Sequence, residues 1–424
     1  MIRSIYIETL LIINWGFQVD KIRLCALLLS VVLSIPAFAD DTSISNKTSG
    51  GPGYGGVGYS VHQTVDGGYI IGGTEYSNKP EYLSQMVWLI KTDANGNKVW
   101  DRIFGGSHND IGYSVQQTRD GGYILTGSTE SFGAGGKDLW LIKTDANGNE
   151  IWNRTFGGLR DDWGRSVQQT TDGGYIITGS MYSYNSAHLS QMVWLLKTDA
   201  DGNEVWDRIF GGPRDDWGYS VQQTNDGGYI ITGGTKSFGE NGNSALWLIK
   251  TDPNGNEIWD RIFGGPGDNL GFSVQQTNDG GYIILGSKES YVPGIKVIWL
   301  IKTDANGEKV WDKTFSGSVD DAGKSVQQTS DGGYIITGSK ESSSGGSQDL
   351  WLIKTEGYGN EIWDKSFDGS GWNEGKSVQQ TNDRGYIISG SAYSYISGGK
   401  NSVVWLIKTD PNGNRVWDKT FDGA

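Results

Sequence analysis

Carboxylate side chains recur at one place in a repeating sequence, and their chemistry suits two kinds of ligand. They stand shortly before a Gly-x-Ser-Val phrase: Asp110, Asp161 with Asp162, Asp215 with Asp216, Asp268, Asp320 with Asp321, and Glu374. Carboxylate oxygens accept hydrogen bonds from sugar hydroxyls and are the ligands that Ca²⁺ prefers. The pairs Asp161–Asp162 and Asp215–Asp216 are therefore the candidate Ca²⁺ ligands, although nothing in the pattern requires a cofactor.

Aromatic side chains recur in a second, more variable segment of six repeats. They are Tyr82, Phe132, Tyr184, Phe238, Tyr291 and Tyr395. Aromatic rings stack on the C–H faces of sugars and bury apolar side chains of protein partners. These six residues are therefore the candidate ligand-binding positions.

Both sets also have a structural interpretation. A repeated carboxylate often caps backbone N–H groups or pairs with a neighbouring arginine, here Arg160 or Arg214. The aromatic residues would then only cover edges of the fold. The sequence leaves both interpretations open.

Residue types that are scarce exclude several kinds of chemistry. The only cysteine, Cys25, lies in an N-terminal segment that we expect to be removed, which leaves no thiolate nucleophile and no disulfide. His62, His108 and His188 stand at non-equivalent places in their repeats, so a shared metal site is not indicated. A formal charge of −14 argues against nucleic acid or an anionic membrane as the partner.

The first 39 residues have the features of a signal peptide or an N-terminal anchor. Lys21 and Arg23 precede an apolar run, Leu24 to Leu33, and Ala37-Phe38-Ala39 fits a signal-peptidase site. The run is shorter than the roughly 20 residues that a membrane span needs. We therefore expect a secreted or cell-surface protein that begins near Asp40, with residues 40–53 as a short linker.

Seven near-copies of one unit fill the rest of the chain, residues 54–424. One series of tryptophans occupies positions 88, 140, 194, 247, 299, 351 and 405, and a second 100, 152, 206, 259, 311, 363 and 417. Both series advance by 52 to 54 residues. A fixed period of this size indicates stacked repeats or a propeller.

Each unit contains four predicted strands, A to D, joined by turns. In the fourth copy these are 218–224, 229–232, 246–251 and 258–263. Asp-Gly-Gly between A and B, and Asp-Pro-Asn-Gly-Asn between C and D, are turn sequences of antiparallel hairpins. The reversing hairpins exclude a parallel β-helix, and no helical period is present.

Strands B and C are apolar at consecutive positions, so both faces of each small sheet must be covered. Radial stacking of like sheets meets this need, and it predicts an all-β, seven-bladed β-propeller of four-stranded antiparallel blades in a single domain. We expect strand A to be innermost and its Gln-Gln pair to join neighbouring blades by amide hydrogen bonds. The B–C and D–A loops then share one face, and that face holds nearly all the variation between copies.

The unit resembles the secreted propeller repeats of archaeal and bacterial surface proteins, within the kelch and quinoprotein-like group. The resemblance rests on Tyr-Ile-Ile-Thr-Gly-Gly at 229–234 and on the Asp252-x-Asn-Gly-Asn turn that precedes Trp259. It implies a propeller but no particular activity. This sequence lacks the residues that form the copper site of galactose-oxidase-like enzymes. It also lacks those that form the calcium loop of integrin-type repeats.

These patterns predict a binding propeller that recognises a glycan or a protein through its variable face, as a monomer and without catalysis. Two alternatives remain. A glycan-active enzyme of the glycoside hydrolase kind would need a carboxylate pair at the channel mouth about 5–9.5 Å apart. A structural surface-layer module would need no site.

Overall fold

A computed structural model describes residues 55–423, with gaps at 80–81, 186–187, 266, 291–293, 318–320, 343–346, 370 and 397–398. At the tips of three hairpins the structure describes the backbone alone. These residues are 77–79, 82–83, 184–185, 188, 394–396 and 399–401. The chain divides into two units, Met1–Ser49 and Gly50–Ala424. The predicted signal segment and linker lie outside the described residues.

The second unit contains seven four-stranded antiparallel sheets, one for each repeat. Blades 1 to 4 comprise β1 (Gly56–Gln63), β2 (Tyr69–Lys79), β3 (Tyr82–Thr92) and β4 (Lys98–Phe104); β5 (Asp110–Gln117), β6 (Tyr123–Thr129), β7 (Asp138–Thr144) and β8 (Glu150–Phe156); β9 (Trp163–Gln169), β10 (Tyr175–Asn185), β11 (His188–Thr198) and β12 (Glu204–Phe210); β13 (Asp216–Gln223), β14 (Tyr229–Thr235), β15 (Ala245–Thr251) and β16 (Glu257–Phe263). Blades 5 to 7 comprise β17 (Leu270–Gln276), β18 (Tyr282–Glu289), β19 (Lys296–Thr303) and β20 (Lys309–Phe315); β21 (Ala322–Gln328), β22 (Tyr334–Glu341), β23 (Gln348–Thr355) and β24 (Glu361–Phe367); β25 (Asn373–Gln380), β26 (Tyr386–Ile396), β27 (Gly399–Thr409) and β28 (Arg415–Phe421).

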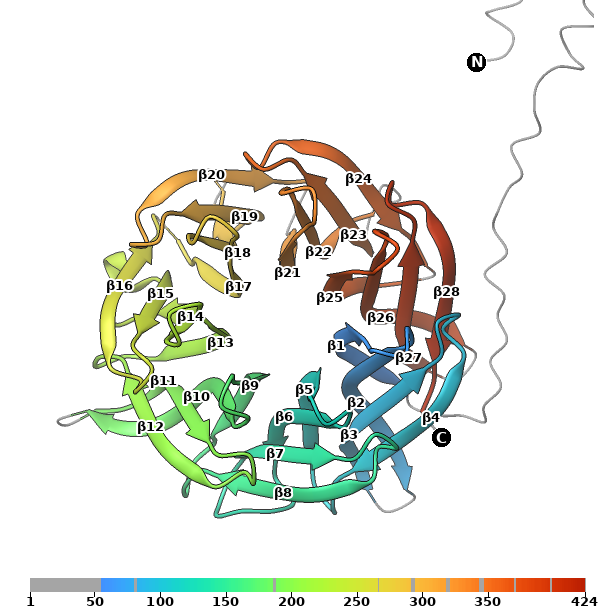
Figure 1. The fold of residues 1–424 in the computed structure, drawn as a ribbon, viewed down its shortest axis with the longest axis horizontal. Helices are drawn as coiled ribbons and strands as arrows, with labels where there is room; N and C mark the ends of the chain where they lie inside the picture. Colours follow the sequence, from blue (N-terminus) through green and yellow to red (C-terminus); the bar gives the residue numbers. More distant parts are fainter. Residues whose placement is uncertain are drawn as a thin grey trace, which may run out of the picture. The chain divides into compact units, whose positions relative to one another are not determined.

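The sheets are arranged around a central opening, with the first strand of each innermost and the fourth outermost (Figure 1). The predicted fold, a seven-bladed β-propeller of four-stranded antiparallel blades, is confirmed. Helix is almost absent, since the described residues contain only a three-residue 3-10 turn, η1 (Glu240–Gly242). The described part contains no helix that is long and apolar enough to cross a membrane.

The core consists of layers between neighbouring blades. The layer between blades 3 and 4, for example, joins Leu195 and Phe210 to Ile231 and Trp247, all of them buried. This arrangement explains why strands B and C are apolar on both faces, because each sheet contributes to two layers. The tryptophan in the third strand of every blade is only 1 to 4 % exposed.

The repetition of both tryptophan series predicts that all fourteen are core, but the second tryptophan of each repeat is not fully buried. It lies half-buried on the outermost strand and packs edge-on against the first tyrosine of strand B in the next blade, as Trp100 does on Tyr123 at 5.8 Å. The same ring lies against the glycine of the next C–D turn, Gly148, whose φ is +77°. A side chain there would clash with the ring, so glycine is required both for space and for the left-handed backbone.

The face with the A–B and C–D turns is nearly identical in every blade. Asp93 caps the C–D turn, since its carboxylate accepts hydrogen bonds from the N–H groups of Asn95 and Asn97 at 2.9 and 2.8 Å. On the neighbouring turn the buried Lys91 ammonium pairs with Asp66 at 2.9 Å, and all seven blades repeat this ion pair. The sequence-based prediction of an Asp-capped hairpin turn is correct, whereas the lysine partner was not anticipated.

Glutamine side chains join neighbouring blades around the channel, as the sequence predicted. The second glutamine of each innermost strand accepts a hydrogen bond from the A–B turn of the blade before it, and this bond occurs at all seven junctions. The first glutamine accepts from the backbone of the next blade at six junctions within the described residues. At the seventh, His62 stands where that glutamine would be.

The first and last blades meet without sharing a strand. Each described sheet is built from one continuous repeat. Bonds from Gln63 to Gln379 and from Asn382 to Gln63, at 2.6 and 2.9 Å, close the ring as they do elsewhere. Gly55 adds an isolated parallel bridge to Ser402. Within the described residues, closure therefore depends on side-chain bonds, packing and this one backbone bridge.

Candidate functional site

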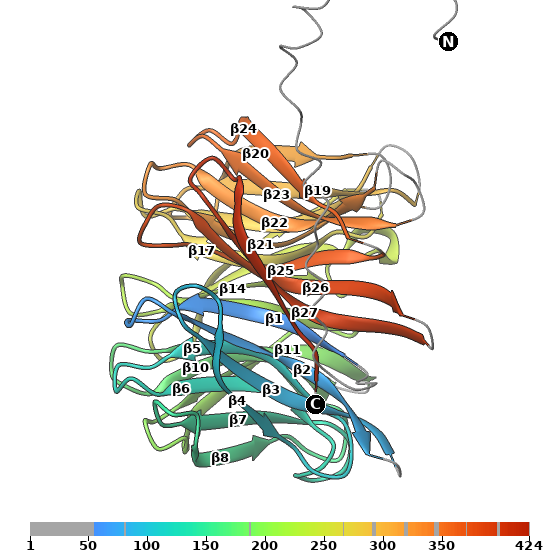
Figure 2. The ribbon, with the colours of Figure 1, turned by 90° about the vertical axis from the view of Figure 1, so that its right-hand side faces the viewer.

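The B–C and D–A loops meet on one face of the propeller. The loop before a blade bonds to the B–C segment of that blade, as in the hydrogen bond from the N–H of Glu130 to the carbonyl of Asn109 at 2.9 Å. Strands B and C are eleven residues long in blades 1, 3 and 7, against seven or eight in the other blades. Figure 2 shows this face at the right, where the β26–β27 hairpin projects.

Only two of the six candidate aromatic side chains lie in the part that the structure describes. Tyr82, Tyr184 and Tyr395 belong to the three long hairpins, and Tyr291 to a gap; the side chains of all four lie outside the described residues. Phe132 and Phe238 are described and are 45 % and 46 % exposed. Each packs against the third-strand tryptophan of its own blade, with ring centroids 5.3 Å apart.

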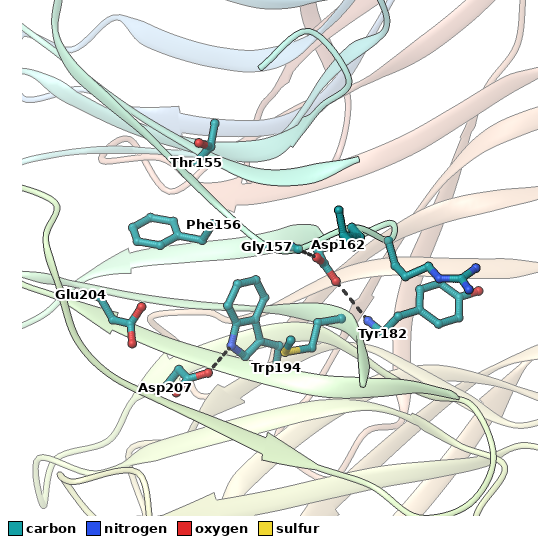
Figure 3. Close-up of a pocket in the computed structure, with 12 residues that line it drawn as sticks. Thr155, Phe156, Gly157, Asp162, Tyr182, Trp194, Glu204 and Asp207 are labelled. Atoms are coloured by element: carbon teal, nitrogen blue, oxygen red, sulfur yellow. Dashed lines mark hydrogen bonds between the residues drawn. The ribbon is translucent and has the colours of Figure 1, made fainter. Parts of the chain in front are cut away.

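Two grooves open between blades on this side of the ring. One, of about 410 Å³, lies between the end of β8 and blade 3, and it is lined by Tyr182, Trp194 and Asp207 among others (Figure 3). In it the indole N–H of Trp194 donates to Asp207 at 3.0 Å. The equivalent groove between β12 and blade 4 has about 390 Å³ and is lined by Phe238 and Trp247. The two grooves occupy equivalent places at successive blade junctions, and each contains the third-strand tryptophan of its blade. They differ in the aromatic residue beside that tryptophan, which is Tyr182 in the first groove and Phe238 in the second.

The first carboxylate of each predicted calcium pair joins two blades. Asp161 accepts a hydrogen bond from the N–H of Lys137 at 3.0 Å, and Asp215 accepts one from Gln191 at 3.0 Å. Asn109 makes the same contact to Gln85 at 3.1 Å. Because an amide replaces the carboxylate there, the contact needs an acceptor oxygen and not a negative charge.

The second carboxylate holds its own loop. Asp162 accepts from the N–H groups of Gly158 and Tyr182 at 2.8 and 3.0 Å and is 1 % exposed (Figure 3). Asp216 accepts from the N–H of Gly212 at 2.9 Å and from the hydroxyl of Ser237 at 2.7 Å. Burial raises the pKa of Asp162 to about 6. These four carboxylates are loop caps, and neither Arg160 nor Arg214 forms an ion pair with them in the described part.

The described residues contain no group of three His, Cys, Asp or Glu side chains that could hold a metal ion. Asp138 lies near Asp162 across the junction of blades 2 and 3, and the Asp138 carboxylate, 1 % exposed, also has a raised pKa because of burial. Both carboxylates bond to backbone N–H groups and are almost fully buried, although Asp162 lies at the wall of the groove beside blade 3.

The blades differ from one another in the residue at one position near the channel. Every innermost strand contains a β-bulge directly after its glycine. The extra residue is left unpaired in the ladder, and such bulges redirect a side chain. The residues at the seven bulges, which we call the bulge ring, are Tyr59, Tyr113, Arg165, Tyr219, Phe272, Lys324 and Lys376. All seven are half-buried.

Contacts between adjacent members connect the bulge ring around the channel. Tyr59 meets Tyr113 edge-on at 5.4 Å, and Tyr219 meets Phe272 at 5.5 Å. The guanidinium of Arg165 lies 4.2 Å from the centre of the Tyr113 ring. Lys324 and Lys376 both pair with Glu374, at 3.3 and 2.6 Å. Burial would raise the pKa of Glu374, but the two ammonium groups outweigh it and lower that pKa.

Sequence reasoning included Glu374 among the candidate carboxylates but missed the bulge ring. The signal was available, because in the phrase Gly-x-Ser-Val only the x position differs strongly between copies, and it differs between aromatic and cationic residues. A bulge cannot be located from alternation alone, so x could not be assigned to the channel. The serines that follow are constant and bond to the next blade, as Ser114 does to the N–H of Val167 at 3.3 Å.

Comparison with known proteins supports the fold and nothing finer. No protein-family model matches the chain, and no curated protein matches it. Among solved structures, the chain is similar to a puromycin hydrolase S511A mutant complexed with PGG, with a TM-score of 0.52 and 12 % identity over 87 % of this chain and 54 % of that one. It is also similar to the β-propeller domain of the Trilobed protease from Pyrococcus furiosus, with a TM-score of 0.48 and 9 % identity over 87 % and 96 % of the two chains.

A third solved structure is YCF48 bound to D1 peptide, with a TM-score of 0.46 and 10 % identity over 80 % of this chain and 90 % of that chain. At such identities the likeness shows a shared β-propeller fold alone. The kelch or quinoprotein-like membership that the repeat suggested is not shown by any of these matches.

Proposed function

We propose that this protein is a non-catalytic binding propeller that holds a partner over the mouth of its central channel. The observation that carries the proposal is the bulge ring. Within the Gly-x-Ser-Val phrase of the innermost strands, the bulge is the one position where the side-chain chemistry changes from blade to blade, while the residues of that phrase that hold the blades together stay constant.

The distribution of constant and variable residues separates scaffold from recognition. The Asp66–Lys91 pair and its equivalents, the glutamine bonds and the third-strand tryptophans recur in all seven blades, as the fold requires. A purely structural module would need no variation at the bulges. Varied residues on a rigid support are typical of binding surfaces.

An enzyme that acts on glycans is the less favoured function. Glycosidic cleavage requires two carboxylates that a substrate can reach. Asp162 and Asp216 are 1 % and 0 % exposed, and both are occupied as loop caps. Glu374 is neutralised by two lysines. A binding function makes no such demand.

The partner of this proposal is a protein or a glycan outside the cytoplasm. The location rests on the signal-like segment that ends at Ala39. N-terminal sequencing of exported protein tests it, with Asp40 as the expected first residue. Exported material that retained Leu24 to Ala39 would favour an anchor.

Binding of the full chain to a peptide array and a glycan array tests the function itself. We expect ligands whose binding weakens in Arg165→Gln and Tyr219→Ala while the melting temperature of each variant stays near that of the parent. Arg208→Gln is the matched control, because that guanidinium stacks on Trp206 of the outermost strand at 5.2 Å, away from the bulge ring. Ligands that bind all the variants alike would place the site elsewhere.

A further inference from the structure

We infer that the bulge ring recognises a carboxylate group of a polypeptide partner, with Arg165 as the main anion contact. This inference rests on the proposed function and specifies its ligand. It follows from the charges of the ring, from the state of each cation, from the arrangement of the aromatic rings and from the loops that surround them.

The bulge ring is positive in a protein that is otherwise strongly negative. It contains Arg165, Lys324 and Lys376, and the only carboxylate paired with these cations in the described part is Glu374. Two positive charges are thus left in excess, whereas the whole chain carries a formal charge of −14. A local field of opposite sign at the mouth of a channel favours an anionic group there over other parts of the surface.

The three cations are not equivalent. The ammonium groups of Lys324 and Lys376 share the two oxygens of Glu374. Arg165 forms no ion pair and no hydrogen bond with the residues that the structure describes, and its guanidinium only stacks on Tyr113. Its five N–H donors suit a carboxylate, which can accept two of them side by side.

The aromatic members position the cations and do not offer open stacking platforms. Arg165 lies over Tyr113, Lys324 over Phe272 and Lys376 over Tyr59, at 4.2, 4.9 and 5.7 Å from the ring centres. Cations therefore occupy one face of three of the four rings. A sugar would need a free ring face, whereas a compact carboxylate needs only the exposed donors of Arg165.

A polypeptide fits the surroundings of the bulge ring better than a small free anion. The blades that carry Tyr59, Arg165 and Lys376 are blades 1, 3 and 7, and these are the blades with the eleven-residue B–C hairpins. A partner that reaches both the channel mouth and these hairpins must be extended. A chain that presents an Asp or Glu side chain, or its own C-terminus, meets both conditions.

A peptide array in matched pairs tests the inference with the full chain. Each peptide is displayed with a free C-terminal carboxylate and as the amide, and each internal Asp or Glu has an Asn or Gln counterpart. We expect binding only to the carboxylate members of some pairs. Arg165→Gln should weaken that binding roughly 10- to 100-fold, in line with the loss of a charged hydrogen-bonded pair. Lys324→Gln should weaken it less, and Arg208→Gln should leave it unchanged.

The outcomes separate this inference from the function on which it rests. If the amide members bind as well as the carboxylates while Tyr219→Ala and Arg165→Gln still weaken binding, the carboxylate assignment is wrong and the binding site stands. Binding of uronic-acid glycans but of no peptide would overturn the polypeptide assignment. Should Arg165→Gln fail to fold, Arg165→Lys keeps the charge but loses the paired donors, and undiminished carboxylate binding by that variant would contradict the role of the guanidinium.

Discussion

At the scale of single residues, Glu75 occupies a place that no other blade fills in this way. In six blades an Asp or Asn lies two residues before the glycine of strand A, but blade 1 has Gly56 there, and Glu75 projects from strand B instead. Glu75 is 4 % exposed, and its Oε2 has no hydrogen-bond partner among the residues that the structure describes. Burial, with a smaller contribution from Asp101, raises the pKa of Glu75 to about 7.

Glu75→Gln should therefore stabilise the protein in a pH-dependent way. The folded pKa lies above the ordinary value of 4.5, so folding favours the protonated form, and stability is lost as pH rises through 7. We expect a higher melting temperature for the variant at pH 8 and no difference at pH 5. Glu204→Gln, at an exposed position on β12, is the control. Equal effects at the two pH values would show that Glu75 does not titrate near neutrality.

For His62 the dependence of stability on pH has the opposite sign to that of Glu75. Burial lowers the pKa of His62 to about 4, so the unfolded chain binds a proton near pH 6.5 that the folded chain takes up only below about 4. Stability contributed by the neutral ring is lost as pH falls from 6.5 towards 4. His62→Gln should remove this loss, and it should also supply the glutamine that the other six blades have at this position. We therefore expect the substitution to raise the denaturation midpoint more at pH 5 than at pH 8. A variant that responds to pH as the parent does would refute the assignment.

The loop carboxylates predict the outcome of a calcium titration. Asp161, Asp162, Asp215 and Asp216 already accept hydrogen bonds from N–H or O–H donors. We therefore expect melting temperatures that are the same with Ca²⁺ and with chelator. A calcium-dependent rise that disappears in Asp161→Asn with Asp162→Asn would instead support the calcium-site hypothesis.

At the scale of elements, the two tryptophan series should differ in energetic weight. Trp247 is 3 % exposed within the layer between blades 3 and 4, whereas Trp259 is half-buried on β16. Trp247→Ala should cost about 3–5 kcal/mol of unfolding free energy, as other buried aromatics do. Trp259→Ala should cost clearly less. Denaturant titration measures both, and equal losses would contradict the difference in burial.

The elements themselves were largely predictable, and the details that position the site were not. The Asn-Gly and Asp-Gly-Gly turns predicted the hairpins. The consecutive apolar residues of strands B and C predicted that both faces of each sheet are packed. The bulge at Tyr113 leaves no local mark, because the ladder register depends on the partner strand. The direction of Phe132, onto Trp140 rather than into a rim, depends on contacts that spacing alone does not specify.

At the scale of the whole molecule, the loops predict a circular permutant. Five or six residues separate the final phenylalanine of a blade from the first residue of the next innermost strand, for example five between Phe104 and Asp110. Joining Ala424 directly to Tyr54 would place five residues between Phe421 and Gly56. A chain joined there and opened in the loop between blades 3 and 4 should fold with a denaturation midpoint near that of the parent. A large loss would mean that closure needs the natural ends.

The separation between the bulge ring and the contacts that close the propeller has a consequence for how such a protein can diverge. Repeat duplication supplies seven copies of a single position, and each copy can change by point substitution without disturbing a hydrogen bond of the ring closure. Sevenfold repetition in the scaffold thus coexists with an asymmetric inner surface. Such an architecture can acquire a new ligand while its folding free energy stays nearly constant, so its specificity and its stability are free to evolve at different rates.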